Sequence, residues 1–158
     1  AIGKVSDIYA HQGITQSIHA TGNMALFDAT LKAFATLPKG GLVFVNFVDF
    51  DSSFGHRRDV AGYADALEAF DSRLPELEAL LNPDDLIVIS ADHGCDPTFP
   101  GSDHTREHVP VLVKGTDDKG HFIGRRDTFA DIGQSIAEHL QIDPLHQGIS
   151  FLVPPKTL

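Results

Sequence analysis

Leu86-Ile-Val-Ile-Ser-Ala-Asp92-His93-Gly94 is an apolar run of strand length that ends in a carboxylate and an imidazole. Gly94 allows a tight turn, and a loop rich in Gly and Pro leads on to a second imidazole, His104. In an open α/β sheet, ligands bind just beyond the carboxyl ends of the strands, which is where this run places Asp92 and His93. The stretch therefore predicts a sheet strand with functional side chains at its end.

A second apolar run that ends in the same residue types lies earlier in the chain. Leu42-Val-Phe-Val-Asn-Phe-Val48 is followed by Asp49, Asp51 and His56. Because side chains alternate along a strand, Asp49 and Asp51 could face the same side, with Asp51 as a ligand and Asp49 as its support. Carboxylate oxygens and imidazole nitrogens suit Zn²⁺ or Mn²⁺. Together the two runs predict a metal site at one edge of a sheet.

The composition is that of a globular domain. The chain has 158 residues, of which 42% are hydrophobic and 22% charged, enough for one domain with a buried core. A net charge of −10 argues against nucleic acid or an anionic membrane as the main partner. The single cysteine excludes an internal disulfide and favours the cytoplasm. No apolar stretch is long enough to span a membrane.

The remaining elements alternate between helix and strand. They are a short strand or extended segment at 4–9, a helix from residue 23 that stops before residue 38, a helix capped by Asp59 with a break or kink at Pro75, a strand at 109–113, and a last helix capped by Asp127 or Thr128. This alternation predicts an α/β architecture with a mostly parallel sheet.

Each candidate ligand also has a simpler explanation. Asp92 and His93 could form a buried hydrogen-bonded pair or a surface turn, and a loop histidine such as His104 is usually solvated. The constrained loop between these residues favours the functional interpretation. Arg57 and Arg58 could bind phosphate through their planar guanidinium groups, with Arg57 as the candidate, but salt bridges to Asp59 or other acidic residues explain them equally well. We expect Cys95 to be structural, because no clear pattern of cations lies beside it.

Metal-assisted phosphoryl chemistry fits this set of side chains. Two divalent cations about 3.5–4 Å apart can clamp a phosphoryl group. Two cations would need more than five protein ligands, and the strong candidates are only five: Asp51, His56, Asp92, His93 and His104. No Ser or Thr stands at an unambiguous position for a nucleophile, so the chain supplies most of a metal centre without an evident attacking group.

Two segments resemble the signatures of the bacterial phosphopentomutase family, which belongs to the alkaline phosphatase superfamily of binuclear metalloenzymes. They are Val48-Asp-Phe-Asp-Ser-Ser-Phe-Gly-His-Arg-Arg-Asp59 and Ala91-Asp-His-Gly-Cys-Asp-Pro-Thr-Phe-Pro-Gly-Ser-Asp-His-Thr-Arg-Glu-His-Val-Pro110. The segments 3–10 and 126–133 look like further family segments. The Asp-His-Gly and His-Thr pattern is shared with cofactor-independent phosphoglycerate mutase, but the stretch Phe-Gly-His-Arg-Arg-Asp favours phosphopentomutase.

The resemblance implies a fold and a ligand set. The fold would be a three-layer α/β/α sandwich with a mostly parallel sheet. Asp92 and His93 would bind one Mn²⁺, and Asp51, His56 and His104 would bind the other. Zn²⁺ or Mg²⁺ could replace Mn²⁺, because the ligand preferences of these ions overlap.

The resemblance also implies a reaction and a larger protein. Family members move phosphate between C1 and C5 of ribose or deoxyribose through a phosphothreonine, in the cytoplasm. They are longer than this chain: an N-terminal portion supplies the threonine and another metal-binding Asp, and an inserted cap domain holds much of the sugar site. Residues 1–158 are therefore expected to be one portion of the core domain, inactive alone, with the missing N-terminal part as a partner.

Two other functions stay open at this point. One is a phosphatase or sulfatase-like hydrolase of the same superfamily, which would release the group that it cleaves. The other is a metal-binding or interaction domain without catalysis.

Overall fold

A computed structural model describes residues 1–115, 120 and 122–152. The chain separates into two compact units. The first comprises Ala1–Leu80 and Ala91–Val109, and the second comprises Leu81–Ser90 and Pro110–Leu158. No helix among the described residues is long and apolar enough to cross a membrane.

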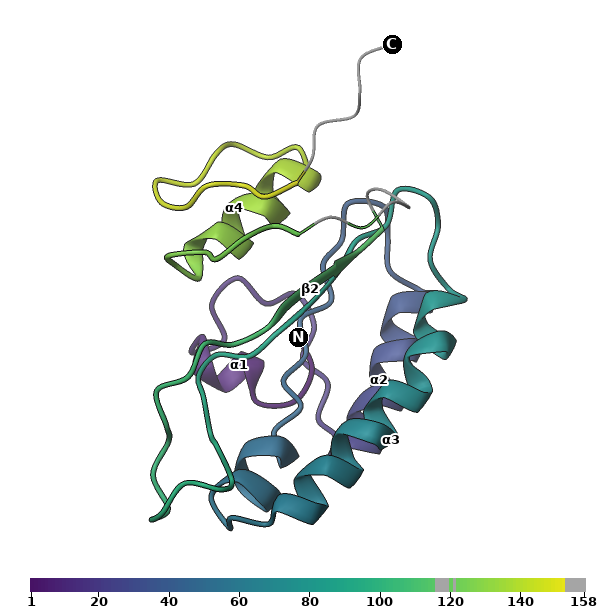
Figure 1. The fold of residues 1–158 in the computed structure, drawn as a ribbon. Coiled ribbons are helices and arrows are strands. Elements are labelled where there is room, and N and C mark those ends of the chain that lie inside the picture. Colours follow the sequence, from purple (N-terminus) through teal and green to yellow (C-terminus); the bar gives the residue numbers. More distant parts are fainter. Residues whose placement is uncertain (116–119, 121, 153–158) are drawn as a thin grey trace. The chain divides into compact units, whose positions relative to one another are not determined.

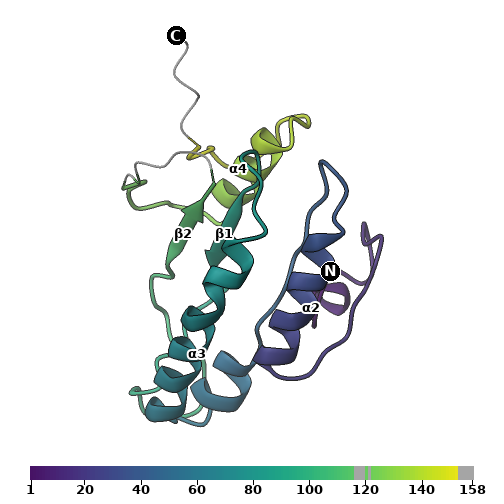
Figure 2. The same ribbon diagram turned by 90° about the vertical axis from the view of Figure 1, so that its right-hand side faces the viewer.

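The first unit is built around two long helices, α2 (Asn23–Ala35) and α3 (Val60–Glu78). Figure 1 and Figure 2 both show them side by side. Aromatic rings fill the space beside them: the Phe27 ring lies 5.5 Å from Phe70, and Phe70 lies 5.0 Å from Phe47. Leu26 and Phe27 are fully buried, so the apolar face of α2 is the centre of this core.

Both helix predictions in this unit are confirmed, with one correction. α2 begins at Asn23 and ends before Pro38, and the Asp59 carboxylate accepts the backbone N–H of Gly62 at the start of α3. The suggested break at Pro75 is wrong, because α3 runs through it to Glu78. Proline removes one backbone donor, but the Pro75 carbonyl still accepts from the N–H of Ala79 and continues the helix.

The strands predicted in the first unit are present only in part. The segment 4–9 is not extended: α1 (Val5–Ile8) is a short helix, and the positive φ of Gly3 turns the chain just before it. The run 42–48 is not a regular strand. It pairs in parallel with Ile2 at Val45, and Ile2 pairs in parallel with Ile18 on its other side. Parallel pairing is thus present as isolated bridges.

The second unit contains β1 (Ile87–Ser90) and β2 (Val111–Lys114), close to the predicted strands. They pair antiparallel in the register Ile87↔Lys114 to Ser90↔Val111, and they form the only sheet among the described residues. The α/β class holds, but the mostly parallel, three-layer arrangement is not confirmed, because β1 and β2 pair antiparallel. Parallel neighbours need a crossover connection, usually a helix, and the segment 91–110 contains none.

The last helix, α4 (Ala130–His139), buries polar side chains. Of the two predicted caps, Thr128 is the one whose hydroxyl accepts the N–H of Ala130. The Asp131 carboxylate accepts from the Ile149 N–H and the Arg126 guanidinium, and the Ser135 hydroxyl accepts the Phe151 N–H. Hydrogen bonds to buried polar side chains therefore attach residues 149–151 to this helix.

Candidate metal centre

Asp51 and His56 lie one turn apart on a π-helix rather than on a loop. The π-helix η1 (Phe50–Gly55) carries Asp51 near its start, and His56 follows its end. The His56 N–H donates to the Asp51 carbonyl at 2.9 Å, five residues back. This spacing places both side chains on one side, with Nε2 of His56 3.4 Å from Oδ1 of Asp51. Single π turns are frequent at functional sites.

His93 and His104 come together because the chain folds back between them. Gly94 and Thr105 form an antiparallel bridge, in which the Thr105 N–H donates to the Gly94 carbonyl at 3.1 Å. The two imidazole rings stack with their centroids 3.8 Å apart. A Cβ at residue 94 would lie 2.6 Å from the Thr105 carbonyl oxygen, so this approach requires glycine.

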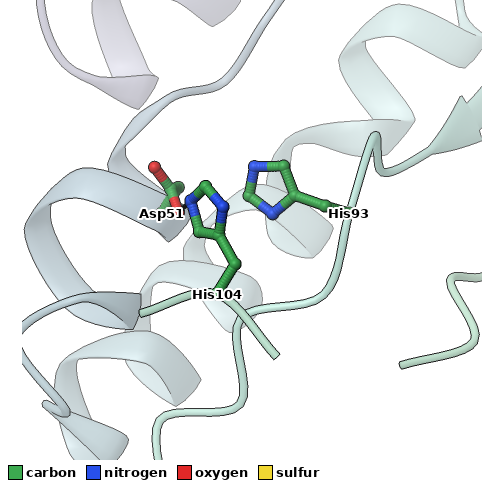
Figure 3. Close-up of side chains that lie close together, drawn as sticks. All are labelled: Asp51, His93 and His104. Carbon is green, nitrogen blue, oxygen red and sulfur yellow. Dashed lines mark ion pairs between the residues drawn. The ribbon is translucent and has the colours of Figure 1, made fainter. Parts of the chain in front are cut away.

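The π-helix η1 and the two segments that carry His93 and His104 come together around Oδ1 of Asp51. His104 Nε2 lies 3.2 Å from Asp51 Oδ1, and Figure 3 shows the His104 ring between Asp51 and His93. Asp51 Oδ1 is buried and has no hydrogen-bond partner. A buried acceptor without a donor is uncommon in folded proteins. The surroundings of this oxygen therefore fit a bound cation.

Two of the imidazoles are oriented with Nε2 available as a ligand. Nδ1 of His56 bonds to the Ser102 carbonyl, and Nδ1 of His93 bonds to the Gly94 carbonyl at 3.1 Å. Because a carbonyl oxygen only accepts, each Nδ1 must carry the proton, which leaves the lone pair on Nε2. Metal-binding histidines are commonly held in this way by a second hydrogen bond.

Two overlapping groups of side chains could hold a metal. The ligand atoms of Asp51, His93 and His104 lie within 4.8 Å of one another, as do those of Asp51, His56 and Cys95. The first group offers oxygen and nitrogen, and the second adds sulfur. Four of the five predicted ligands thus converge, and Asp51 belongs to both groups.

Asp92 and Arg57 lie apart from these groups. The Asp92 side chain is 72% exposed, with Oδ1 3.8 Å from Nε2 of His93. Arg57 is exposed, whereas the next residue, Arg58, is half-buried and turned toward the loop that carries His104. Four backbone carbonyls accept hydrogen bonds from the Arg58 guanidinium: those of Gly55, Asp96, Gly101 and Asp103.

The sequence did not indicate that Arg58 holds the loop with His104 or that Cys95 lies among the candidate ligands. Nothing in the Arg57-Arg58 pair indicates which guanidinium faces inward. Burial raises the pKa of the Cys95 thiol, and the nearby Asp51 carboxylate raises it further. Burial also raises the pKa of Tyr63 on α3, with smaller contributions from Cys95 and Asp51. The Cys95 thiol and the Tyr63 hydroxyl therefore stay protonated at neutral pH when no cation is bound.

Comparison with known proteins supports a metal cofactor. The family described as the Metalloenzyme superfamily matches residues 3–144. The chain is 74% identical over 153 residues to a phosphopentomutase of Legionella pneumophila, which covers 96% of this chain and 38% of the relative. It is 59% identical to a phosphopentomutase of Yersinia enterocolitica and 60% identical to one of Aliivibrio salmonicida, each over 152 residues, which are 96% of this chain and 37% of each relative.

These relatives confirm the resemblance that the two motifs suggested. The chain spans less than two fifths of the length of the curated relatives that it matches. The similarity nevertheless extends over nearly all of its own residues.

Proposed function

This chain belongs to the metalloenzyme superfamily, and on that premise we propose that it is part of a metal-dependent phosphomutase acting on pentose phosphates. The reaction would interconvert the 1-phosphate and 5-phosphate of ribose or deoxyribose. The observation that carries this proposal is the buried Asp51 Oδ1, which lacks a hydrogen-bond donor and faces Nε2 of both His56 and His104.

The ligand assignment proposed for the bound state follows the two motifs. Asp51, His56 and His104 would hold one divalent cation, and Asp92 and His93 would hold the other, with Mn²⁺ favoured over Zn²⁺ or Mg²⁺. A bound divalent cation supplies charge stabilisation at phosphoryl oxygens. The Ser102 and Gly94 carbonyls fix the rings of His56 and His93 by accepting hydrogen bonds from their Nδ1–H groups. The exposed Arg57 is a candidate for binding phosphate.

The attacking hydroxyl is proposed to lie outside these residues. Thr105 is the threonine next to His104, but it is buried and its Oγ1 accepts the Asp96 N–H at 2.8 Å. A hydroxyl engaged in this way has a structural role. The proposed reaction therefore uses a threonine from another part of the polypeptide, which would become a phosphothreonine. Residues 1–158 would be one portion of a cytoplasmic core domain and inactive alone.

An assay of the protein at its natural full length tests this function. With Mn²⁺ present, ribose 1-phosphate should convert to ribose 5-phosphate without net release of inorganic phosphate. The His104→Ala variant should lose this exchange. Release of phosphate without exchange would favour the hydrolase, and tight Mn²⁺ binding without either reaction would favour a metal-binding domain.

A further inference from the structure

Cys95 is placed among metal ligands by the fold and not by a sequence motif. Its sulfur and the ligand atoms of Asp51 and His56 all lie within 4.8 Å of one another. All three residues are half-buried, whereas the group of Asp51, His93 and His104 includes an exposed histidine. Gly55 allows this approach, because a Cβ at residue 55 would lie 2.6 Å from the Cys95 Sγ. The sulfur therefore packs directly against the π-helix that carries Asp51.

Two of the neighbours of this sulfur, Asp51 and His56, already present the atoms that a cation needs, and the Arg58 guanidinium lies 3.9 Å from it. Nδ1 of His56 is bonded to the Ser102 carbonyl, so Nε2 carries the free lone pair. That Nε2 lies 3.4 Å from Asp51 Oδ1, the buried oxygen without a hydrogen-bond partner. Thiolate sulfur, imidazole nitrogen and carboxylate oxygen are each ligands of Zn²⁺ in proteins.

We propose that Cys95 is a metal ligand and that Asp51, His56 and Cys95 bind a thiophilic divalent cation such as Zn²⁺ or Cd²⁺. Thiolate ligands select soft or borderline cations, whereas oxygen ligands suit Mn²⁺. Binding forms a metal–sulfur bond and transfers the thiol proton to solvent, and no electron is exchanged. Three protein ligands leave a fourth position open to water or to a phosphate oxygen.

Asp51 is shared between the sulfur-containing site and the proposed Mn²⁺ site. In the proposed ligand assignment Asp51 and His56 also hold one Mn²⁺ with His104, so a cation held by the sulfur competes for the same carboxylate and imidazole. A thiophilic metal would therefore displace Mn²⁺ from Asp51. This inference rests on the proposed function in that it takes Asp51 and His56 as ligands.

Co²⁺ is the probe for the test, in the protein at its natural full length. Co²⁺ bound to a thiolate gives a sulfur-to-metal charge-transfer band in the near ultraviolet, and Co²⁺ bound only to oxygen and nitrogen does not. The parent protein should show the band, and Cys95→Ser should still bind Co²⁺ but lack it. His93→Ala should keep the band, because His93 lies outside the sulfur-containing group.

Competition between metals gives a second readout. Cys95→Ser should lower Zn²⁺ affinity by at least about tenfold, since even the loss of a residue behind the ligands costs about 10- to 100-fold. Its Mn²⁺ affinity should fall much less. Co²⁺ binding without the band in the parent, a band that survives in Cys95→Ser, or equal Zn²⁺ affinity in the two proteins would overturn the assignment of Cys95 and leave the proposed function intact. Failure to bind any divalent cation would overturn both.

Discussion

The Asp51 carboxylate is the residue on which the metal centre most depends. It is the one side chain common to both ligand groups, and its buried Oδ1 faces two imidazoles. Each histidine contributes to one group only, so its loss should affect part of the centre. Under the proposed ligand assignment, Asp51 is the one carboxylate beside His56 and His104, so removing it should weaken that cation site most.

Metal titrations of single variants test this division. Asp51→Asn should weaken Mn²⁺ binding more than any histidine variant, because an amide oxygen lacks the charge that attracts a cation. Under the proposed ligand assignment, His56→Ala and His104→Ala lose affinity at the same one of two sites, and His93→Ala at the other. Asp103→Asn is the control, since its exposed side chain adjoins His104 but belongs to neither group. Calorimetric Mn²⁺ binding that is equal in Asp51→Asn and Asp103→Asn would show that the assignment is wrong.

At the scale of elements, the loop from Asp96 to Asp103 is held mainly by one side chain. The Arg58 guanidinium donates to three carbonyls of this loop and to that of Gly55, beside His56. Its backbone adopts the left-handed conformation, with φ of 55°. Arginine suits this role because its planar group presents several donors in a fixed arrangement, which lysine cannot match.

Replacing Arg58 should therefore loosen the loop that carries His104. We expect Arg58→Met and Arg58→Lys each to lower Mn²⁺ affinity by about tenfold, in the range found for residues that orient metal ligands. The matched control is Arg57→Met, which changes the exposed neighbour. Circular dichroism should show that helix content is unchanged. Equal Mn²⁺ affinities in the Arg57 and Arg58 variants would exclude this positioning role.

The attachment of residues 149–151 to α4 should depend on pH. The N–H of Ile149, and then Arg126, lower the pKa of the buried Asp131 carboxyl. Because this pKa is lower in the folded than in the unfolded protein, the carboxylate stabilises the fold above about pH 3.9, the ordinary aspartate value. That contribution is lost as the pH falls through the lowered pKa.

Asp131→Asn measures this contribution. At pH 7 the variant should be destabilised by about 1.5–3 kcal/mol, typical of hydrogen bonds to a charged group. The difference from the parent should shrink as the pH falls below about 4. Urea unfolding at both pH values checks the prediction, with the exposed Asp127→Asn as the control. A penalty that stays constant with pH would contradict the role given to the charge.

For the whole molecule, sequence patterns within a single segment predicted the helices better than they predicted which strands pair with one another. Apolar periodicity and the Asp59 cap are local, and they located α2 and α3 to within a few residues. Strand pairing is decided by distant segments, so the run 42–48 was expected as a full strand but is bridged only at Val45 in the part of the chain described. The candidate ligands followed from residue types after apolar runs, whereas the position of Cys95 beside Asp51 and His56 depends on how distant segments pack.

Removal of metal should destabilise the whole protein if the proposed centre is correct. A cation that binds only the folded state adds about 2.7 kcal/mol at a concentration 100 times its Kd. In the protein at its natural full length, EDTA should lower the melting temperature and added Mn²⁺ should restore it. His104→Ala should show a smaller difference between the two conditions. A melting temperature unaffected by EDTA and Mn²⁺ would contradict the proposed centre.

The π-helix that carries Asp51 also makes this segment sensitive to its length. An α-helix of the same length would turn His56 by about 140° from Asp51, because each of the five residues rotates the chain by about 100°. Ser52→Ala keeps the residue count and should preserve the alignment of the two side chains. Among variants of this protein, exchanges at the exposed position 52 should be tolerated, whereas a single-codon insertion there, which adds a rotation of about 100°, should abolish Mn²⁺ binding.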